Sequence, residues 1–416
     1  MSGTIRVPGD KSISHRALIL ACLSDGESAI RGILESEDVE STAGVLRSLG
    51  ALVPTLSASF AVKGSGLRGL RQPRSELQCG NSGTTTRLMA GVVAAHPIVA
   101  QFVGDASLSR RPMKRVAEPL RYMGARFDFA RGDGLPMTIH GTDLRSIDWD
   151  TKASSAQVKS AILLAGLVAG VEVRVTERSP SRDHTERMLR AAGVDIENDG
   201  NQVCLRPTTR LAPLEIDVPA DPSSAAFFVA LAALASAGEL VLTHICLNPT
   251  RTGFLDVMQR MGARIDVVER TESGGETVAS LRISPSELRG AVVGGADIGF
   301  IIDELPLLAC VAAGAGVGLE IKGAEELRVK ESDRIATVVH NLRAVGAEVD
   351  ELPDGLRVHA ALRPLAGRID PRSDHRIAMA FGILSAATGN QITVMNPRCV
   401  AVSYPRFWED LRTVTA

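Results

Sequence analysis

The sequence predicts a two-domain protein of the α/β (α+β) class, built from six similar units with three units in each domain. The first observation behind this prediction is a recurring start point, where a cluster of Ser, Asn, Asp or Lys residues leads directly into an Ala-rich apolar run. These starts lie about seventy residues apart, which is longer than the repeats of solenoid proteins. The runs are Lys11–Cys22, Gly80–Val93, Ser154–Ala169, Asp221–Leu234, Ile302–Ala315 and Ser373–Ala387.

The second observation is the length of the chain. Its 416 residues exceed what one ordinary hydrophobic core covers, so two domains are expected. A seam near Val218–Asp221 precedes the fourth unit, and a matching crossover near Pro8–Asp10 leaves the extreme N-terminus with the later domain. The predicted domains are therefore residues 11–219, and residues 1–10 together with 220–416.

The third observation is a second, amphipathic helix in each unit. Five of these helices stop at a Gly followed by Ala or Val, as expected where the chain turns through the left-handed conformation. The alternating segments that follow, such as Arg264–Val268 and Glu348–Asp350, are typical of strands. The predicted second helices are Asp38–Leu49, Pro112–Met123, Asp183–Ala192, Thr252–Met261, Ser332–Val345 and Tyr404–Val414.

Each apolar run is expected to form a helix buried inside its domain, because its residues are apolar nearly all round. The polar residues at its start are suited to capping that helix. A capped, buried helix still presents backbone amides at its N-terminus, and such amides bind anions. The repeat therefore predicts several anion-binding helix ends.

The composition excludes several function classes. The net charge of −2 gives no global field that would attract DNA or an acidic membrane, and 3% aromatic residues is few for a protein that stacks bases. The six cysteines are scattered, so reduced thiols are expected rather than a metal site or disulfides. The apolar runs are too short to cross a bilayer, and the first residues show no signal-peptide pattern, so we expect a soluble, cytoplasmic protein.

Five short polar motifs stand at predicted helix starts. Arg side chains in such places match carboxylate and phosphate groups with two parallel hydrogen bonds. Taken singly, most of these motifs fit a capped helix or a solvated surface pair equally well. The density of charge in Arg328–Arg334 favours a functional site. The motifs are Lys11-Ser12-Ile13-Ser14-His15-Arg16, Gly80-Asn81-Ser82-Gly83-Thr84-Thr85, Ser109-Arg110-Arg111-Pro112, Arg328-Val329-Lys330-Glu331-Ser332-Asp333-Arg334 and Ser373-Asp374-His375-Arg376.

Two acids, Asp303 and Glu304, stand before the apolar run that begins at Leu305. Acids in a first helical turn usually complement the helix dipole. A carboxylate beside several cations and a substrate hydroxyl also suits a general base. Sequence spacing leaves both interpretations open.

Together these motifs resemble one family over essentially the whole chain, the 3-phosphoshikimate 1-carboxyvinyltransferases, also called 5-enolpyruvylshikimate-3-phosphate synthases. Several ordered motifs at the proper spacing are far more specific than any one of them. The resemblance rests on Lys11-Ser12 with Arg16, Gly80-Asn81-Ser82-Gly83-Thr84, Arg111-Pro112, Ser155-Ala156-Gln157, Arg182-Asp183-His184-Thr185-Glu186, Asp303, Arg328–Arg334 and Asp374-His375-Arg376.

The resemblance implies two similar domains, each of three βαβαββ repeats with buried helices in an inside-out, barrel-like arrangement, closing on substrate by a hinge. It also implies a reaction in which shikimate 3-phosphate takes the enolpyruvyl group of phosphoenolpyruvate and phosphate is released, on the route to chorismate and the aromatic amino acids. Two such anions repel by roughly 4 kcal/mol per charge pair at 4 Å in an effective dielectric of 20. Cations from both halves of the molecule, meeting at a shared gap, would offset this without a metal or cofactor.

The resemblance also implies roles for single residues. Asp303 would accept the proton of the hydroxyl, Glu331 would donate one to the methylene carbon, and Lys11 would touch both substrates and assist proton transfer. Shikimate 3-phosphate would be held by Lys11, Ser12, Arg16, Ser155, Gln157, Arg182, Asp303 and Lys330. Phosphoenolpyruvate would be held by Lys11, Gly83, Arg111, Gln157, Arg334 and Arg376. No partner beyond these small molecules is expected, and we expect a monomer that binds neither nucleic acid nor membrane.

The chain departs from the family pattern near its C-terminus. Many members carry a Lys two residues before an aromatic-Pro pair, where this chain reads Val402-Ser403-Tyr404-Pro405. One family contact to phosphoenolpyruvate therefore has no counterpart here. The stretch Arg182–Glu186 resembles a subgroup often less sensitive to glyphosate, but Gly83 is kept where tolerant members often have Ala. We therefore expect inhibition by glyphosate.

Three alternatives stay open at this point. The sister enzyme that transfers enolpyruvyl to UDP-N-acetylglucosamine shares the resemblance, but it usually carries a reactive Cys where this chain reads Asp105–Ser109. A non-catalytic anion-binding protein on the same repeats would not need Asp303 and Glu331. An RNA-processing cyclase of related fold is disfavoured by the scarce aromatic residues and the near-neutral charge.

Overall fold

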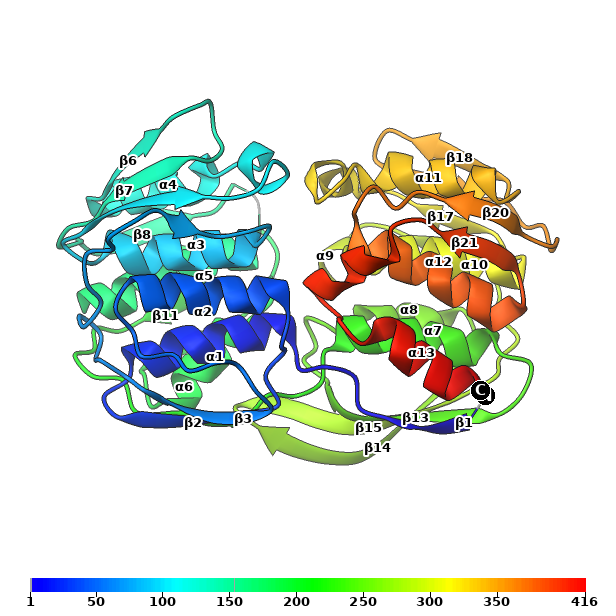
Figure 1. The fold of residues 1–416 in the computed structure, drawn as a ribbon, viewed down its shortest axis with the longest axis horizontal. Coiled ribbons are helices and arrows are strands. Elements are labelled where there is room, and N and C mark those ends of the chain that lie inside the picture. The colour runs from blue at the N-terminus through cyan, green and yellow to red at the C-terminus, as the bar shows by residue number, and fades with distance from the viewer. Residues whose placement is uncertain (1, 153) are drawn as a thin grey trace. The chain divides into compact units, whose positions relative to one another are not determined.

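The computed structural model describes residues 2–152 and 154–416, and these divide into two compact units (Figure 1). Unit 1 comprises the chain up to Pro8, Pro219–Thr271 and Thr277–Ala416. Unit 2 comprises Gly9–Val218 and the short segment Glu272–Glu276. The mixed α/β class predicted from the sequence is confirmed.

Unit 2 contains three buried helices, α1, α3 and α5, which lie side by side (Figure 1). Its helices are α1 (Lys11–Leu23), α2 (Glu37–Ser48), α3 (Gly83–Ala94), α4 (Lys114–Met123), α5 (Ala156–Ala169) and α6 (His184–Ala191), with the 3₁₀ turn η1 (Leu108–Arg110). Its strands are β2 (Glu27–Arg31), β3 (Ser59–Lys63), β4 (Leu77–Gln78), β5 (Val99–Val103), β6 (Arg126–Phe129), β7 (Met137–His140), β8 (Ile147–Asp150), β9 (Val173–Thr176), β10 (Ile196–Asn198), β11 (Gln202–Leu205) and β12 (Glu215–Asp217).

Unit 1 likewise packs α7, α10 and α12 against one another. Its helices are α7 (Pro222–Leu234), α8 (Gly253–Arg260), α9 (Asp297–Ile301), α10 (Leu305–Ala315), α11 (Arg334–Ala344), α12 (His375–Thr388) and α13 (Phe407–Thr415), with the 3₁₀ turns η2 (Glu325–Val329) and η3 (Pro397–Val402). Its strands are β1 (Ser2–Ile5), β13 (Glu239–Cys246), β14 (Arg264–Ser273), β15 (Glu276–Ser284), β16 (Ala291–Val293), β17 (Leu319–Ile321), β18 (Val349–Leu352), β19 (Gly355–Val358), β20 (Ala366–Ile369) and β21 (Gln391–Val394).

The sheets repeat one pattern of strand pairing. In the orders β4-β5-β7-β6, β8-β9-β11-β10 and β16-β17-β19-β18, the first two strands are parallel and the later neighbours are antiparallel. A parallel pair needs a crossover, and here the crossover carries a buried helix: α3 between β4 and β5, and α5 between β8 and β9. The sheets thus fix the direction in which the buried helices run.

The predicted glycine stops are confirmed. All five glycines, Gly50, Gly124, Gly193, Gly262 and Gly346, have φ between 79° and 125°. Residues with a Cβ rarely adopt this backbone conformation, so glycine is needed where each amphipathic helix ends and the chain turns into a strand.

Several helices begin later than the sequence pattern indicates. The run predicted to start at Ile302 becomes helical only at Leu305, because α9 and a turn come first. The helix predicted from Tyr404 begins at Phe407, after the 3₁₀ turn η3 and Pro405. In both cases the residues just before the helix are in turns, and their side chains lie at the N-terminal end of the helix.

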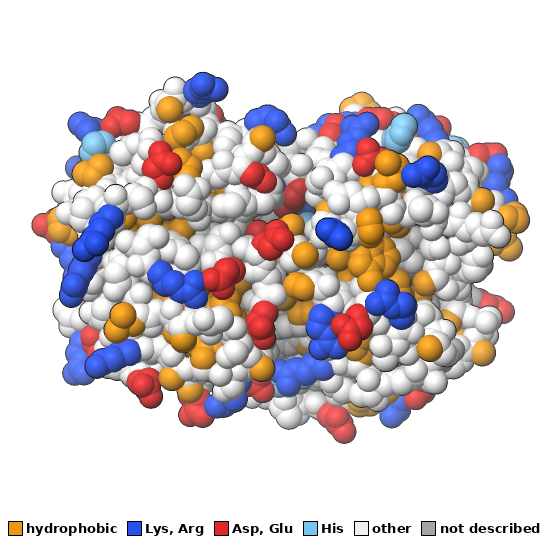
Figure 2. Space-filling model, in the orientation of Figure 1, with side chains coloured by type: hydrophobic (Ala, Val, Ile, Leu, Met, Phe, Trp, Pro, Cys, Tyr) orange, Lys and Arg blue, Asp and Glu red, His pale blue; other side chains and the backbone are white. Residues whose placement is uncertain are grey.

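The distribution of surface charge and the lengths of the apolar helices agree with what the composition predicts. On the face shown in Figure 2, basic and acidic side chains are interspersed, in keeping with the net charge of −2. None of the helices in the described part of the chain has the length and apolarity needed to span a bilayer.

Candidate active site

In unit 2, the first helix begins at a predicted site residue, Lys11. Asp10 caps this helix, because its Oδ1 accepts a hydrogen bond from the backbone N–H of Ile13 at 2.8 Å. The ammonium Nζ of Lys11 lies 3.0 Å from Oδ2 of Asp38, at the start of α2. Lys11 is one-fifth exposed, and its charge is held in place by Asp38.

Arg16, one turn further along α1, is bound by protein acceptors. Its Nη1 donates to the carbonyl oxygen of Ser12 at 2.8 Å, its Nε to Oγ1 of Thr185 at 2.7 Å, and its Nη2 to Oγ of Ser160 at 2.7 Å. The residue is only 3% exposed. Arg16 therefore ties α1 to α5 and α6, and this joins the N-terminal ends of these three helices.

The start of α3 is joined to the start of α5. Ser82 caps α3, and the first helical residue is Gly83. Arg87, one turn later, donates from Nη1 to Oε1 of Gln157 at 2.7 Å, and Gln157 donates to Oγ1 of Thr84 at 3.0 Å. Gln157 thus lies where the amide ends of α3 and α5 meet.

Arg111 lies at the same helix end. Its Nη2 donates to Oδ1 of Asn81 at 2.8 Å, and a Cβ placed on Gly83 would come 3.3 Å from its Nη1. A guanidinium beside the N-terminal amides of a helix is a favourable place for an anion. Glycine at position 83 leaves that place open.

The remaining predicted residues of unit 2 lie at nearby element ends. Ser12 is in the first turn of α1, Ser155 is the N-cap residue of α5, and Arg182 comes two residues before α6. Ser155 and Arg182 are both half-buried. These hydrogen bonds therefore bring the ends of α1, α3, α5 and α6 together, and the unit 2 residues predicted from the sequence lie at or near these ends.

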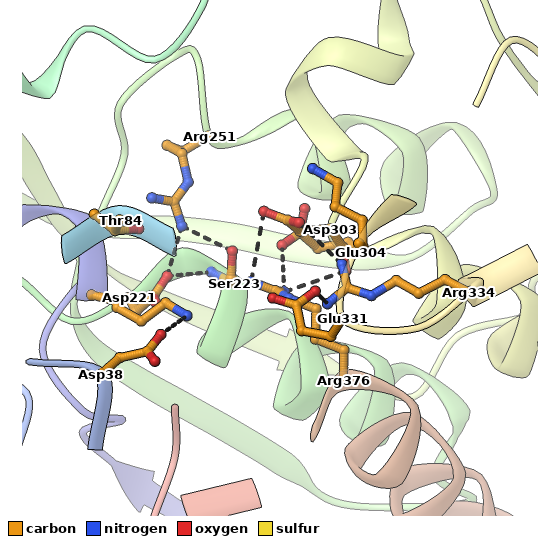
Figure 3. Close-up of polar contacts among 12 residues, drawn as sticks. Asp38, Thr84, Asp221, Ser223, Arg251, Asp303, Glu304, Glu331, Arg334 and Arg376 are labelled. Carbon is orange, nitrogen blue, oxygen red and sulfur yellow. Dashed lines mark hydrogen bonds and ion pairs between the residues drawn. The ribbon is translucent and has the colours of Figure 1, made fainter. Parts of the chain in front are cut away.

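In unit 1, Arg334 is the centre of a second cluster (Figure 3). It is the first residue of α11 and is 1% exposed. Its Nη2 lies 2.7 Å from Oε2 of Glu331, and its Nη1 lies 3.3 Å from Oδ1 of Asp303. Burial opposes the charge of Arg334, but the carboxylates of Asp374, Glu331 and Asp303 raise its pKa above the ordinary value. The guanidinium stays protonated.

Arg376 completes this cluster from the first turn of α12. Its Nη1 donates to Oε1 of Glu304 at 3.3 Å, and its Nη2 lies 3.7 Å from Oδ2 of Asp303. Asp303 is therefore placed between two guanidinium groups, as Figure 3 shows. The acid and base candidates, Glu331 and Asp303, share Arg334 as a common partner.

Lys330 has a different partner from its neighbours in the sequence. Its Nζ pairs with Oε1 of Glu326 at 3.1 Å, one turn back in the chain. The structure thus joins Asp303, Glu331, Arg334 and Arg376 in one network of ion pairs. Lys330 is paired with Glu326 instead.

The structure adds residues that the sequence reasoning did not single out. Arg251 donates from Nη2 to Oδ1 of Asp221 and to Oγ of Ser223, both at 2.8 Å, at the start of α7 (Figure 3). Asp38 and Arg87 hold Lys11 and Gln157 in the same way. Asp38 and Arg87 are charged residues in the first two turns of α2 and α3, and this position was the available signal, whereas Arg251 lies just before α8. Sequence alone does not tell which helix ends meet.

Within the part of the chain that the structure describes, no group of three or more His, Cys, Asp or Glu side chains is arranged to hold a metal ion. The site residues offer cationic groups that can bind anions, together with carboxylates that can take part in acid–base chemistry. That combination suits reactions of anionic substrates in which protons move.

Comparison with known proteins gives consistent likenesses over the whole chain. The family model described as EPSP synthase (3-phosphoshikimate 1-carboxyvinyltransferase) matches residues 1–411. A 3-phosphoshikimate 1-carboxyvinyltransferase of Sulfurihydrogenibium sp. (strain YO3AOP1) is 45% identical, covering 100% of this chain and 97% of the relative. One from Acidithiobacillus ferrooxidans (strain ATCC 53993 / BNL-5-31) is 46% identical, covering 98% and 94%. The solved EPSP synthase of Acinetobacter baumannii superimposes with a TM-score of 0.88 at 39% identity, covering 99% of this chain and 95% of that one.

Proposed function

We propose a residue-level account of catalysis that starts from one premise: the chain belongs to the EPSP synthase (3-phosphoshikimate 1-carboxyvinyltransferase) family. The enzyme transfers the enolpyruvyl group of phosphoenolpyruvate to the 5-hydroxyl of shikimate 3-phosphate and releases phosphate, in the biosynthesis of aromatic amino acids. Its substrates are these two small anions. The assignment of each residue to a step is our proposal.

Shikimate 3-phosphate is assigned to unit 2. The joined N-terminal ends of α1, α3, α5 and α6 supply backbone amides, and Arg182, Lys11 and Gln157 stand at those ends. Helix N-termini favour anions because the helix dipole places partial positive charge there. Ser12, Ser155 and Arg16 complete the binding set, with Asp303 and Lys330 contributing from unit 1.

Phosphoenolpyruvate is assigned to the guanidinium groups. Arg334 and Arg376 lie within one cluster in unit 1, and Arg111 lies at Gly83 in unit 2. Arg forks bind phosphate and carboxylate through two parallel hydrogen bonds, and phosphoenolpyruvate carries both groups. The repulsion between the two substrates is offset by these fixed cations, so binding of both becomes possible.

The chemical step is an addition followed by an elimination. Asp303 takes the proton of the 5-hydroxyl as its oxygen bonds to the enol carbon, and Glu331 gives a proton to the methylene carbon, which becomes a methyl group. Phosphate then leaves from the tetrahedral intermediate, and one methyl proton is lost to restore the double bond. Lys11 touches both substrates and assists proton transfer. The observation that carries this assignment is the pair of contacts from Arg334 to Asp303 and Glu331.

The finer organisation is also part of the proposal. We assign residues 11–219 to one three-repeat domain and residues 1–10 with 220–416 to the other, in the hinged, inside-out arrangement that the family resemblance implies. The repeated pairing of one parallel and two antiparallel strand neighbours supports the repeat. We further propose a cytoplasmic monomer that requires no metal or cofactor and binds neither nucleic acid nor membrane, which sedimentation and assays in chelator would test.

Release of phosphate from phosphoenolpyruvate tests the function directly. The purified protein is incubated with phosphoenolpyruvate and either shikimate 3-phosphate or UDP-N-acetylglucosamine. We expect release with shikimate 3-phosphate only. Release with the nucleotide sugar alone would assign the chain to the sister reaction, and binding of both anions without any release would make it a binding protein.

A further inference from the structure

Three charged side chains outside the proposed catalytic set are buried together in unit 2. The ammonium Nζ of Lys159 lies 2.7 Å from Oε2 of Glu177 and 2.8 Å from Oε1 of Glu186. Their side chains are 2%, 1% and 1% exposed, respectively. Removing three ions from water costs several kcal/mol for each, and the attraction between them only partly offsets this cost. Such a cluster is weak evidence for stability, and its contacts indicate another role.

The cluster joins three elements. Lys159 is in the first turn of α5, Glu177 follows β9 directly, and Glu186 is in the first turn of α6. Between Glu177 and α6 runs the segment 178–183. This segment contains Arg182, which we assign to shikimate 3-phosphate.

Glu177 also holds the residue next to Arg182. Its Oε1 accepts from Oγ of Ser181 at 2.6 Å, and its Oε2 accepts from the backbone N–H of Ser181 at 3.3 Å. Lys159 adds a longer contact, from Nζ to the carbonyl oxygen of Ser181 at 3.4 Å. The backbone on the N-terminal side of Arg182 is therefore fixed by the buried cluster.

The same cluster borders the contacts of Arg16. Arg16 donates to the hydroxyl groups of Ser160 and Thr185, and these residues directly follow Lys159 and directly precede Glu186 in the chain. Two cations assigned to shikimate 3-phosphate, Arg16 and Arg182, thus depend on backbone that this ion cluster orders. Lys159 itself has no exposed surface with which to meet the ligand.

We infer that Lys159 is a positioning residue for shikimate 3-phosphate. It acts through Glu177 on Ser181, and so fixes the segment 178–183 that presents Arg182. This inference rests on the proposed function of the site. We call the contacts of Glu177 with Ser181 the clamp. The inference predicts that loss of the clamp weakens binding of shikimate 3-phosphate more than binding of phosphoenolpyruvate.

Ser181→Ala is the sharpest test, because it removes the hydroxyl contact to Glu177 and leaves the three ions in place. Titration calorimetry with shikimate 3-phosphate alone measures the binding constant without turnover. We expect the Kd to rise about 3- to 10-fold, which is less than for loss of a direct hydrogen bond to a charged group, because Ser181 acts on the ligand only through Arg182. The KM for phosphoenolpyruvate should change little, and stability in urea should fall by no more than the loss of one hydrogen bond to a buried carboxylate accounts for. Lys152→Met is the matched control for the Lys159→Met variant described below, since that lysine is 86% exposed and its Nζ lies 3.8 Å from Oε2 of Glu118.

A second pair of variants separates positioning from stability. Glu177→Gln should weaken shikimate 3-phosphate binding more than Glu186→Gln, because only Glu177 contacts Ser181. The double variant Ser181→Ala/Glu177→Gln should bind shikimate 3-phosphate no more weakly than Glu177→Gln alone, because both changes break the same clamp. Lys159→Met should weaken binding and also lower stability.

The outcomes separate the inference from the proposed function. If Ser181→Ala and Glu177→Gln bind shikimate 3-phosphate as the wild type does, while only stability falls, the positioning role is overturned. A wild-type protein that binds shikimate 3-phosphate but releases no phosphate contradicts the proposed function alone, because the binding comparison still stands. A wild type that binds none contradicts both.

Discussion

Arg334 donates from its Nε to Oδ2 of Asp374 at 2.8 Å, and the two side chains are 1% and 0% exposed. Asp374 also caps α12, because its Oδ1 accepts from the backbone N–H of Arg376 at 3.0 Å. One buried carboxylate therefore fixes both guanidinium-bearing residues that we assign to phosphoenolpyruvate in unit 1. The arrangement places Arg334 and Arg376 before any ligand arrives, which lowers the cost of organising the site.

Replacing Arg334 tests this arrangement. Arg334→Met leaves Asp374 buried without its main cation, and breaking a buried pair in this way costs about 3–5 kcal/mol of unfolding free energy. Urea denaturation measures the loss. Arg357→Met, which breaks an exposed pair with Glu320, should cost at most about 1 kcal/mol. Arg334→Lys should be more stable than the Met variant, but its turnover should remain slow, because Lys lacks the planar guanidinium that binds phosphate or carboxylate through two hydrogen bonds. Equal stability of the Met variants would contradict this account.

Gly83→Ala should weaken the binding of both phosphoenolpyruvate and glyphosate. The added Cβ would lie 2.7 Å from Nη1 of Arg87 and 3.3 Å from Nη1 of Arg111, so both guanidinium groups must shift. We expect the KM for phosphoenolpyruvate to rise roughly tenfold, equivalent to about 1.4 kcal/mol. Wild-type turnover should be inhibited by glyphosate, and the variant should need more inhibitor. An unchanged KM for phosphoenolpyruvate in the variant would reject the steric argument, and uninhibited wild-type turnover at high glyphosate would reject the expectation of inhibition.

His15 should make the protein less stable in mild acid. Burial and repulsion from Lys11 and Arg16 hold its pKa well below 6.5. Above pH 6.5 the histidine is neutral in both the folded and unfolded states. As the pH falls below 6.5, only the unfolded chain gains the proton, so stability falls by up to about 1.4 kcal/mol per pH unit.

Urea unfolding of a His15→Gln variant between pH 7 and pH 5 measures this effect. The variant should show a shallower loss of stability with acid than the wild type. His340→Gln, which changes an exposed histidine on α11, should keep the wild-type slope. Parallel slopes for wild type and His15→Gln would show that the buried imidazole is not responsible.

The sequence was sufficient for the buried helices and for several of their caps. Ser82, Asp221 and Asp374 accept backbone hydrogen bonds at the starts of buried helices, as the polar clusters predicted. The first helix is capped by Asp10, one residue before the predicted cluster, and neither α5 nor α10 has a side-chain cap. This success has a physical reason, because capping and helix burial depend on residues close together in the chain. Helix starts were less accurate where a 3₁₀ turn or a short extra helix came first, as before Leu305 and Phe407.

The sequence was insufficient for the partners of the site residues. Gln157 is held by Arg87, 70 positions away, and Arg16 by Thr185, 169 positions away. Such contacts depend on which helix ends the sheets bring together, and no local pattern records that. The buried ion cluster at Lys159 was missed for the same reason, since its apolar neighbours on α5 indicated only a core helix.

The proton-transfer role of Asp303 is the central claim, and one comparison tests it most directly. For Asp303→Ala, the binding constants for both substrates are measured beside kcat for phosphate release. We predict that substrates still bind within a few fold of the wild type, while kcat falls by about 10²- to 10⁴-fold, as for loss of a general base. Turnover close to that of the wild type would contradict the account and remove Asp303 from the mechanism.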